Sequence, residues 1–135
     1  MPLIDVDLNA VKEKPLMPAG QMFTFQIISA LPEQAKNPNK KSGKHEWQVA
    51  TGFKPLDVGW EDRELKHWWS LSEGALSSPD PTFSIKKFFE IVGFPWSSDG
   101  KFNTDDMQII RFIGTLKYGK DRPTLPVLAT IVSKA

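Results

Sequence analysis

Short segments with alternating apolar and polar residues constrain the fold of this chain most strongly. In residues 21–29, Phe23, Phe25 and Ile27 alternate with residues of the opposite face, which is the period of a half-buried strand. Four further segments are predicted as strands: 47–53, 65–71, 113–118 and 127–133. Eleven prolines divide the chain into such short elements. The pattern therefore favours a small, mainly β protein.

One amphipathic helix is predicted between the third and the fourth strand. Its apolar residues recur at i, i+3, i+4 and i+7: Ile85, Phe88, Phe89 and Val92. We expect this helix to begin at Asp80 and Pro81, which suit the N-cap and the first helical position, and to end at Gly93. A second, short helical turn is expected over residues 105–109.

The order of three strands, a helix and two strands is that of a five-stranded OB-fold barrel. We therefore expect one OB-fold domain over residues 1–135, with one helix between strands 3 and 4 and an N-terminal arm at 1–18. A chain of 135 residues is long enough to bury a core without disulfides, and it has no cysteine. No signal peptide and no apolar run of about 18 residues is visible, so no membrane partner is expected.

The net charge of +1 argues against nucleic-acid binding over the whole surface. The charges are unevenly distributed, however. Residues 31–55 contain 5 basic and 2 acidic residues, and residues 111–135 contain 5 and 1, whereas residues 56–110 contain 5 and 10. Two basic segments therefore flank an acidic one.

The basic residues concentrate in the first and the last loop between predicted strands. The first of these loops carries four lysines, and the last carries three cations and the one tyrosine: Lys36, Lys40, Lys41 and Lys44, then Lys117, Tyr118, Lys120 and Arg122. An OB barrel brings its first and last inter-strand loops to one ligand face. Such a lysine run can equally be a merely solvated loop.

Tryptophans supply the second half of the predicted site. Single-strand binding combines a basic groove with aromatic faces on which bases stack. Trp68 lies beside Lys66 on the polar face of the third strand, where it either stacks on a ligand or covers a barrel end. Trp60 is expected at a loop tip with a binding role, whereas Trp47 shares the alternation of the core face.

Catalytic patterns are weak. His45 and His67 lie on different elements with no third ligand at a zinc spacing, so no metal and no cofactor is expected. Acidic residues at Asp105 and Asp106 suit the first turn of a helix. A magnesium-dependent nuclease that uses Asp99, Asp105 and Asp106 remains the enzymatic alternative, but we expect no enzyme.

The chain resembles phage single-stranded-DNA-binding OB-fold proteins, including a related group of phage domains of unknown function. The resemblance runs over nearly the full length and depends on the order of these segments: Leu3-Ile4-Asp5-Val6-Asp7, Pro18-Ala19-Gly20, Lys41-Ser42-Gly43-Lys44, Leu65 with Trp69-Ser70-Leu71, Phe88-Phe89-Glu90-Ile91-Val92-Gly93, and Ile113-Gly114.

This resemblance implies sequence-independent binding of single-stranded DNA during phage replication or recombination, in the host cytoplasm, with replication or recombination proteins as partners. Many replication-type members end in an acidic tail, and residues 131–135 are not acidic, so recruitment through such a tail is not expected. The alternative is a protein-interaction or assembly module on the same barrel, without nucleic-acid binding. Homo-oligomerisation is left open under both.

Overall fold

The structure is a computed structural model, and it describes residues 4–5, 7–10, 14–41 and 43–135. The first residues of the predicted arm, and Leu3, Val6 and Ser42 of the motifs above, lie outside these ranges. The described chain forms these elements in order: β1 (Phe23–Gln34), β2 (Trp47–Pro55), β3 (Leu65–Ser70), α1 (Glu73–Leu76), α2 (Ile85–Val92), the 3-10 helix η1 (Thr104–Ile109), β4 (Arg111–Lys117) and β5 (Val127–Lys134).

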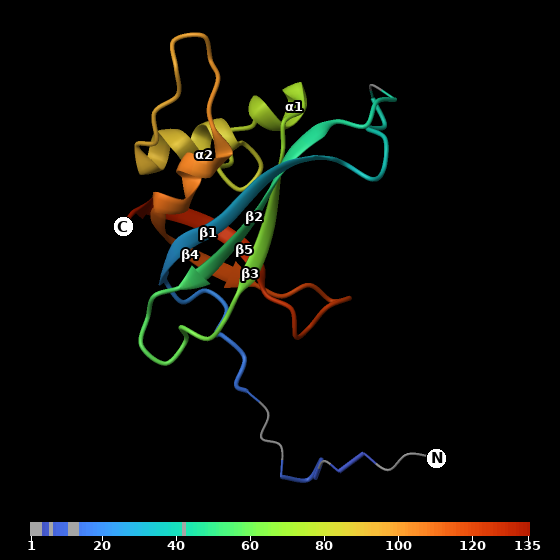
Figure 1. Cartoon of the computed structure of the whole chain (residues 1–135), viewed down its shortest axis with the longest axis vertical. Coiled ribbons are helices and arrows are strands. Elements are labelled where there is room, and N and C mark those ends of the chain that lie inside the picture. Colours follow the sequence, from blue (N-terminus) through green and yellow to red (C-terminus); the bar gives the residue numbers. More distant parts are fainter. Residues whose placement is uncertain (1–3, 6, 11–13, 42) are drawn as a thin grey trace.

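The five strands form one antiparallel sheet in the order β3-β2-β1-β4-β5 (Figure 1). The predicted number and order of strands along the chain, and the mainly β class, are confirmed. β1 is central, because it pairs with β4 through its first residues and with β2 along most of its length. The edge strands β3 and β5 come within 8 Å of each other between Cα atoms. No ladder joins them in the described residues, so the sheet is not a closed barrel.

A bulge in β1 decides which of its side chains point to each face of the sheet. The register with β2 shifts between Ile27 and Ser29, so one extra residue interrupts the alternation. Before the bulge, odd-numbered residues such as Phe25 are buried, and after it Ala30 is buried while Leu31 is exposed. β1 also continues to Gln34, five residues beyond the predicted end.

The core lies between the sheet and α2. Trp69 of β3 stacks on Phe88 of α2 with ring centroids 4.7 Å apart, and Phe88 meets Phe112 of β4 edge to face at 5.2 Å. All four residues of the predicted helix stripe are buried. The faces of the sheet therefore differ, because α2 covers one of them and the odd-numbered residues of β3 point into it.

The beginning of α2 differs from the prediction. The helix starts at Ile85 with Ser84 as its N-cap, whose hydroxyl accepts from Lys87 N at 3.2 Å. Asp80 instead organises the preceding turn, since its Oδ1 accepts from the amide and the hydroxyl of Thr82 at 2.9 and 2.8 Å. Gly93 ends the helix with φ of 71°, as expected. The predicted short helical turn over residues 105–109 is confirmed as η1, whereas α1 is an additional short helix that the sequence did not predict.

The last residues of the N-terminal arm pack against the sheet. Met17 is buried, and its carbonyl accepts from the Tyr118 hydroxyl at 2.5 Å. Arg63 Nη2 donates to the Pro15 carbonyl at 2.7 Å. In the described part of the chain, no helix is both long and apolar enough to cross a lipid bilayer.

Candidate functional site

The face of the sheet opposite α2, here called the outer face, carries a regular array of residues from β1, β2 and β3. The register aligns them in three rows across the strands: Ser29–Gly52–Lys66, Leu31–Ala50–Trp68 and Glu33–Gln48–Ser70. Successive rows are two residues apart on each strand, which corresponds to about 7 Å. The bulge in β1 makes this array possible, because it turns the odd-numbered residues after Ile28 outward.

A groove of about 720 Å³ lies over this array and continues to Lys36 and Asn37 at the start of the β1–β2 loop. All the residues of the three rows except Ser70 line it. Trp68 is 51% exposed and Leu31 is 63% exposed, and the small side chain of Ala50 lies between them in the register. The middle row thus presents an aromatic face beside an apolar wall and a shallow floor. An unpaired base needs such a surface for stacking.

Gly52 lies in the row of Lys66, where neighbouring side chains crowd the backbone. A Cβ atom at this position would lie 2.6 Å from Ser29 Oγ and 3.5 Å from Glu64 Oε1. The side chains of Ser29 and Glu64 therefore take up the space that a side chain at position 52 would need. Gly52 pairs with Lys66 on β3.

The groove has opposite charges at successive rows. Lys66 lies in the row on one side of Trp68, and Glu33 lies in the row on the other side. Gln48 Nε2 donates to Glu33 Oε1 at 2.8 Å, which orients both side chains. Lys36 follows beyond Glu33, where β1 enters the loop. Phosphate groups can therefore be attracted at the two lysines, and the carboxylate separates them.

The β1–β2 loop is folded on itself. Asn39 N donates to the Lys44 carbonyl at 2.8 Å, and His45 Nδ1 lies 2.9 Å from the Ala35 carbonyl. Of the four predicted lysines of this loop, Lys36 lines the groove, whereas Lys41 lines a separate hollow beside Glu73. Lys40 and Lys44 are exposed on the loop outside the groove lining.

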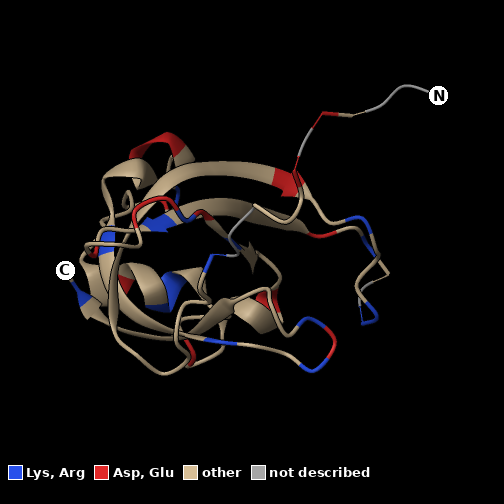
Figure 2. Cartoon of the chain, turned by 90° about the horizontal axis from the view of Figure 1, so that it is seen from below, with Lys and Arg blue, Asp and Glu red and all other residues tan. Residues whose placement is uncertain are grey.

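The β4–β5 loop and the β1–β2 loop both extend toward the right in Figures 1 and 2, and in Figure 1 they lie apart, the β1–β2 loop at the top right and the β4–β5 loop lower down. Figure 2 shows basic residues in each of them. Lys117, Lys120 and Arg122 are exposed. Tyr118 is half-buried with its hydroxyl engaged by the Met17 carbonyl, so it offers less of its ring than the sequence suggested. The groove reaches the β1–β2 loop at Lys36 and Asn37, and no residue of the β4–β5 loop lines it.

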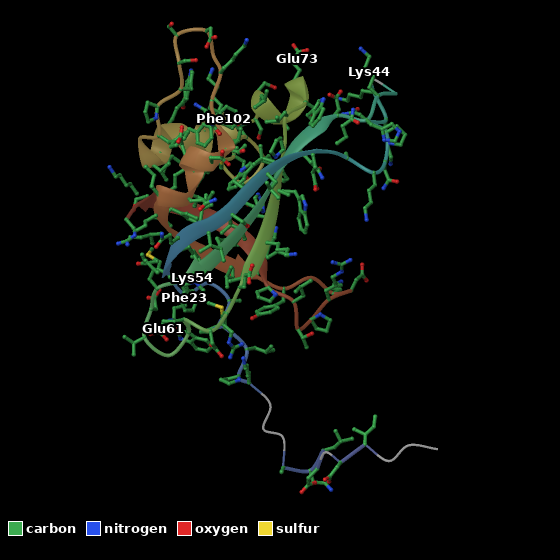
Figure 3. All side chains as sticks on the ribbon, in the orientation of Figure 1. Phe23, Lys44, Lys54, Glu61, Glu73 and Phe102 are labelled. Carbon is green, nitrogen blue, oxygen red and sulfur yellow. The ribbon has the colours of Figure 1, made fainter. Side chains whose placement is uncertain are left out.

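Trp60 lies away from the groove. It packs edge to face against Phe23 with centroids 6.0 Å apart, and the Arg63 guanidinium lies 5.3 Å from its ring centre. Its neighbour Glu61 lies at the end of the sheet opposite Lys44 (Figure 3). The structure therefore places Trp60 as a partly buried residue against the core rather than beside Trp68.

The prediction that Trp47 lies in the core is wrong. The alternation assigned it to the core, but it is 53% exposed. The reason is its position, since it is the first residue of β2 and pairs with Gln34, the last residue of β1. At this end of the sheet the core does not cover its side chain. Val49, two residues further, is fully buried as predicted.

Most residues of the groove on β1 and β2 were not predicted from the sequence. Leu31 and Glu33 were overlooked because the first strand was expected to end at Ser29. Residues 30–34 show no apolar–polar alternation, and Pro32 is unusual inside a strand; β1 pairs there with β2 alone, so an edge proline is tolerated. Ala50 and Gly52 were overlooked because small residues in a strand resemble gaps rather than a binding surface.

The titratable residues outside the groove have structural partners. Burial lowers the pKa of His67, whose Nε2 lies 2.8 Å from the Thr82 carbonyl and whose ring packs on Trp69. The Ser97 hydroxyl donates to Asp99 Oδ1 and thereby lowers the pKa of that carboxyl. Among the described residues, no group of three or more His, Cys, Asp or Glu side chains could hold a metal ion.

Comparisons with protein families, with curated proteins and with solved structures find no match to this chain.

Proposed function

We propose that this chain is a non-enzymatic protein that binds single-stranded DNA across the outer face of β1, β2 and β3. The observation that carries the proposal is the groove, in which the exposed ring of Trp68 lies beside Ala50, between the row of Lys66 and the row of Glu33. Base stacking on an aromatic side chain contributes about 1–3 kcal/mol per base and tolerates any base. Lys66 and Lys36 supply cations for the phosphates at the two ends of the same groove.

We further propose that the sheet is an OB-type barrel that is open between β3 and β5. The central position of β1 between β2 and β4 supports this assignment, as does the approach of the two edge strands. In such a barrel the face of strands 2 and 3, with the first and last inter-strand loops, binds the ligand. The groove on β2 and β3 occupies this position. The resemblance to phage proteins then suggests a role in phage replication or recombination.

Two tryptophans provide a matched test. Trp68 and Trp47 have nearly equal exposure, but only Trp68 lines the groove. We expect Trp68→Ala to weaken binding of a labelled oligo-dT about tenfold, since about 1.4 kcal/mol of stacking is lost. Trp47→Ala should leave affinity within about twofold of the parent, and it should lower stability little because the ring is exposed. Fluorescence anisotropy at low and high salt, with single-stranded DNA, duplex DNA and RNA, measures the affinities of the parent and of the two variants.

The parent protein should bind the single strand more tightly than the duplex, and the affinity should fall steeply with salt. Absence of any binding at low salt would refute the proposal. The second candidate function is a protein-interaction module, which the exposed Trp47 outside the groove favours. A mass that rises with concentration, together with no affinity for nucleic acid, would support this alternative.

A further inference from the structure

We infer that the groove has one base-selective position, which prefers guanine, and that Glu33 and Gln48 read the edge of the base stacked on Trp68. The inference rests on the proposed function and adds a preference to it. Its starting observation is a carboxylate in a groove that would otherwise suit an anionic ligand. Glu33 lies one row from Trp68, on the side opposite Lys66.

The charges along the groove orient a bound nucleotide. A phosphate near Glu33 would be repelled, whereas a phosphate near Lys66 is attracted. For the nucleotide stacked on Trp68, the sugar–phosphate backbone is therefore favoured on the Lys66 side, and Lys36 beyond Glu33 serves a phosphate of another nucleotide. A base stacked on the tryptophan above Ala50 then directs its far edge toward the next row, about 7 Å away along the strands. Glu33 and Gln48 occupy that row.

The hydrogen bond between these two side chains determines what the row can read. Gln48 Nε2 is engaged with Glu33 Oε1 at 2.8 Å, so the amide group is oriented by the carboxylate. Gln48 Oε1 and Glu33 Oε2 remain as acceptors, because an ionised carboxylate only accepts and an amide oxygen accepts through two lone pairs. The row thus offers one remaining acceptor oxygen on each of the two side chains.

Of the four DNA bases, only guanine has two adjacent donors on its Watson–Crick edge, N1–H and the N2 amino group. Thymine has one donor between two carbonyl oxygens, and those oxygens would face the acceptors of the protein. Cytosine and adenine each combine one amino group with an adjacent ring-nitrogen acceptor. A carboxylate beside an amide oxygen is therefore complementary to guanine and partly repels the other three bases.

The test uses the full chain and oligo-dT of about 15 nucleotides with one central position changed to guanine or hypoxanthine. We expect the guanine oligonucleotide to bind about fivefold more tightly than oligo-dT, the low end of the discrimination for a two-bond base contact. Hypoxanthine lacks the N2 amino group, so its oligonucleotide should bind more weakly than the guanine one. Glu33→Gln should abolish the guanine preference while it strengthens binding of oligo-dT, because a negative charge leaves the groove.

Glu90→Gln is the matched control, since it removes the same charge from α2, on the side of the sheet opposite the groove. It should retain the guanine preference. Equal binding of all oligonucleotides by the parent, or a preference that survives Glu33→Gln, would overturn the inference while the proposed function stands. Failure to bind any of the single strands would instead refute the proposed function itself.

Discussion

At the scale of single residues, the surroundings of two glycines in the sheet predict that substitution by alanine lowers stability at one of them much more than at the other. A Cβ on Gly52 would lie 2.6 Å from Ser29 Oγ, and a Cβ on Gly114 would lie 2.6 Å from the Thr130 carbonyl oxygen. The serine hydroxyl can rotate to another staggered position, whereas the carbonyl belongs to the backbone of β5. We expect Gly52→Ala to change the free energy of unfolding by less than about 1 kcal/mol and Gly114→Ala to lower it by about 1–3 kcal/mol.

Urea unfolding of the two variants beside the parent measures this difference. Each serves as the control for the other, because both add one methyl group to a strand glycine. Equal stability of Gly114→Ala and the parent would show that β4 and β5 can separate at no cost.

At the scale of elements, the strands were predictable, and their irregularities were not. Alternation identifies a strand only while the period of two persists, so the bulge at Ile28 hid the end of β1. The same alternation placed Trp47 in the core, because periodicity reports the direction of a side chain and not whether anything covers it. The prediction that Trp68 and Lys66 lie on the polar face of the third strand is confirmed. It succeeded because β3 is regular and α2 covers its other face.

The contact between β3 and the segment before α2 predicts a pH dependence. His67 Nε2 lies 2.8 Å from the Thr82 carbonyl, and burial lowers the pKa of His67 below its ordinary value of 6.5. As pH falls through 6.5, the unfolded chain takes up a proton that the folded protein resists, so the free energy of unfolding falls. The free energy of unfolding stops falling once the pH is below the lowered pKa of His67 in the folded state. Above pH 6.5 His67 is neutral in both states and contributes no pH dependence.

Thermal unfolding of the parent and of His67→Gln between pH 4 and pH 8 measures this contribution, because the other titrating groups are common to both. The difference in stability between the two proteins should favour the parent most above pH 6.5 and shrink as the pH is lowered. A difference that stays constant with pH would contradict the burial of a neutral imidazole at this contact.

At the scale of the whole molecule, a net charge of +1 is compatible with one binding face because the excess of cations is confined to residues 31–55 and 111–135. The β1–β2 and β4–β5 loops, which carry many of these cations, both extend toward the right in Figure 2. If a single strand runs over the outer face to the β4–β5 loop, Lys120 and Arg122 contact phosphates. Each lost phosphate contact on a single strand makes the negative slope of log K against log salt less steep by about 0.7. We expect Lys120→Ala with Arg122→Ala to make it less steep by about 1.4.

The matched control is Lys86→Ala with Lys87→Ala on α2, which removes the same charge from the covered side of the sheet. That pair should leave the slope unchanged, although a longer-range loss of potential can weaken affinity slightly at low salt. Titration of oligo-dT at four or more salt concentrations determines the slopes. An unchanged slope for the loop variant would confine the bound strand to β1, β2 and β3. Because the guanine position beside Glu33 lies within these strands, its preference should be the same in either case.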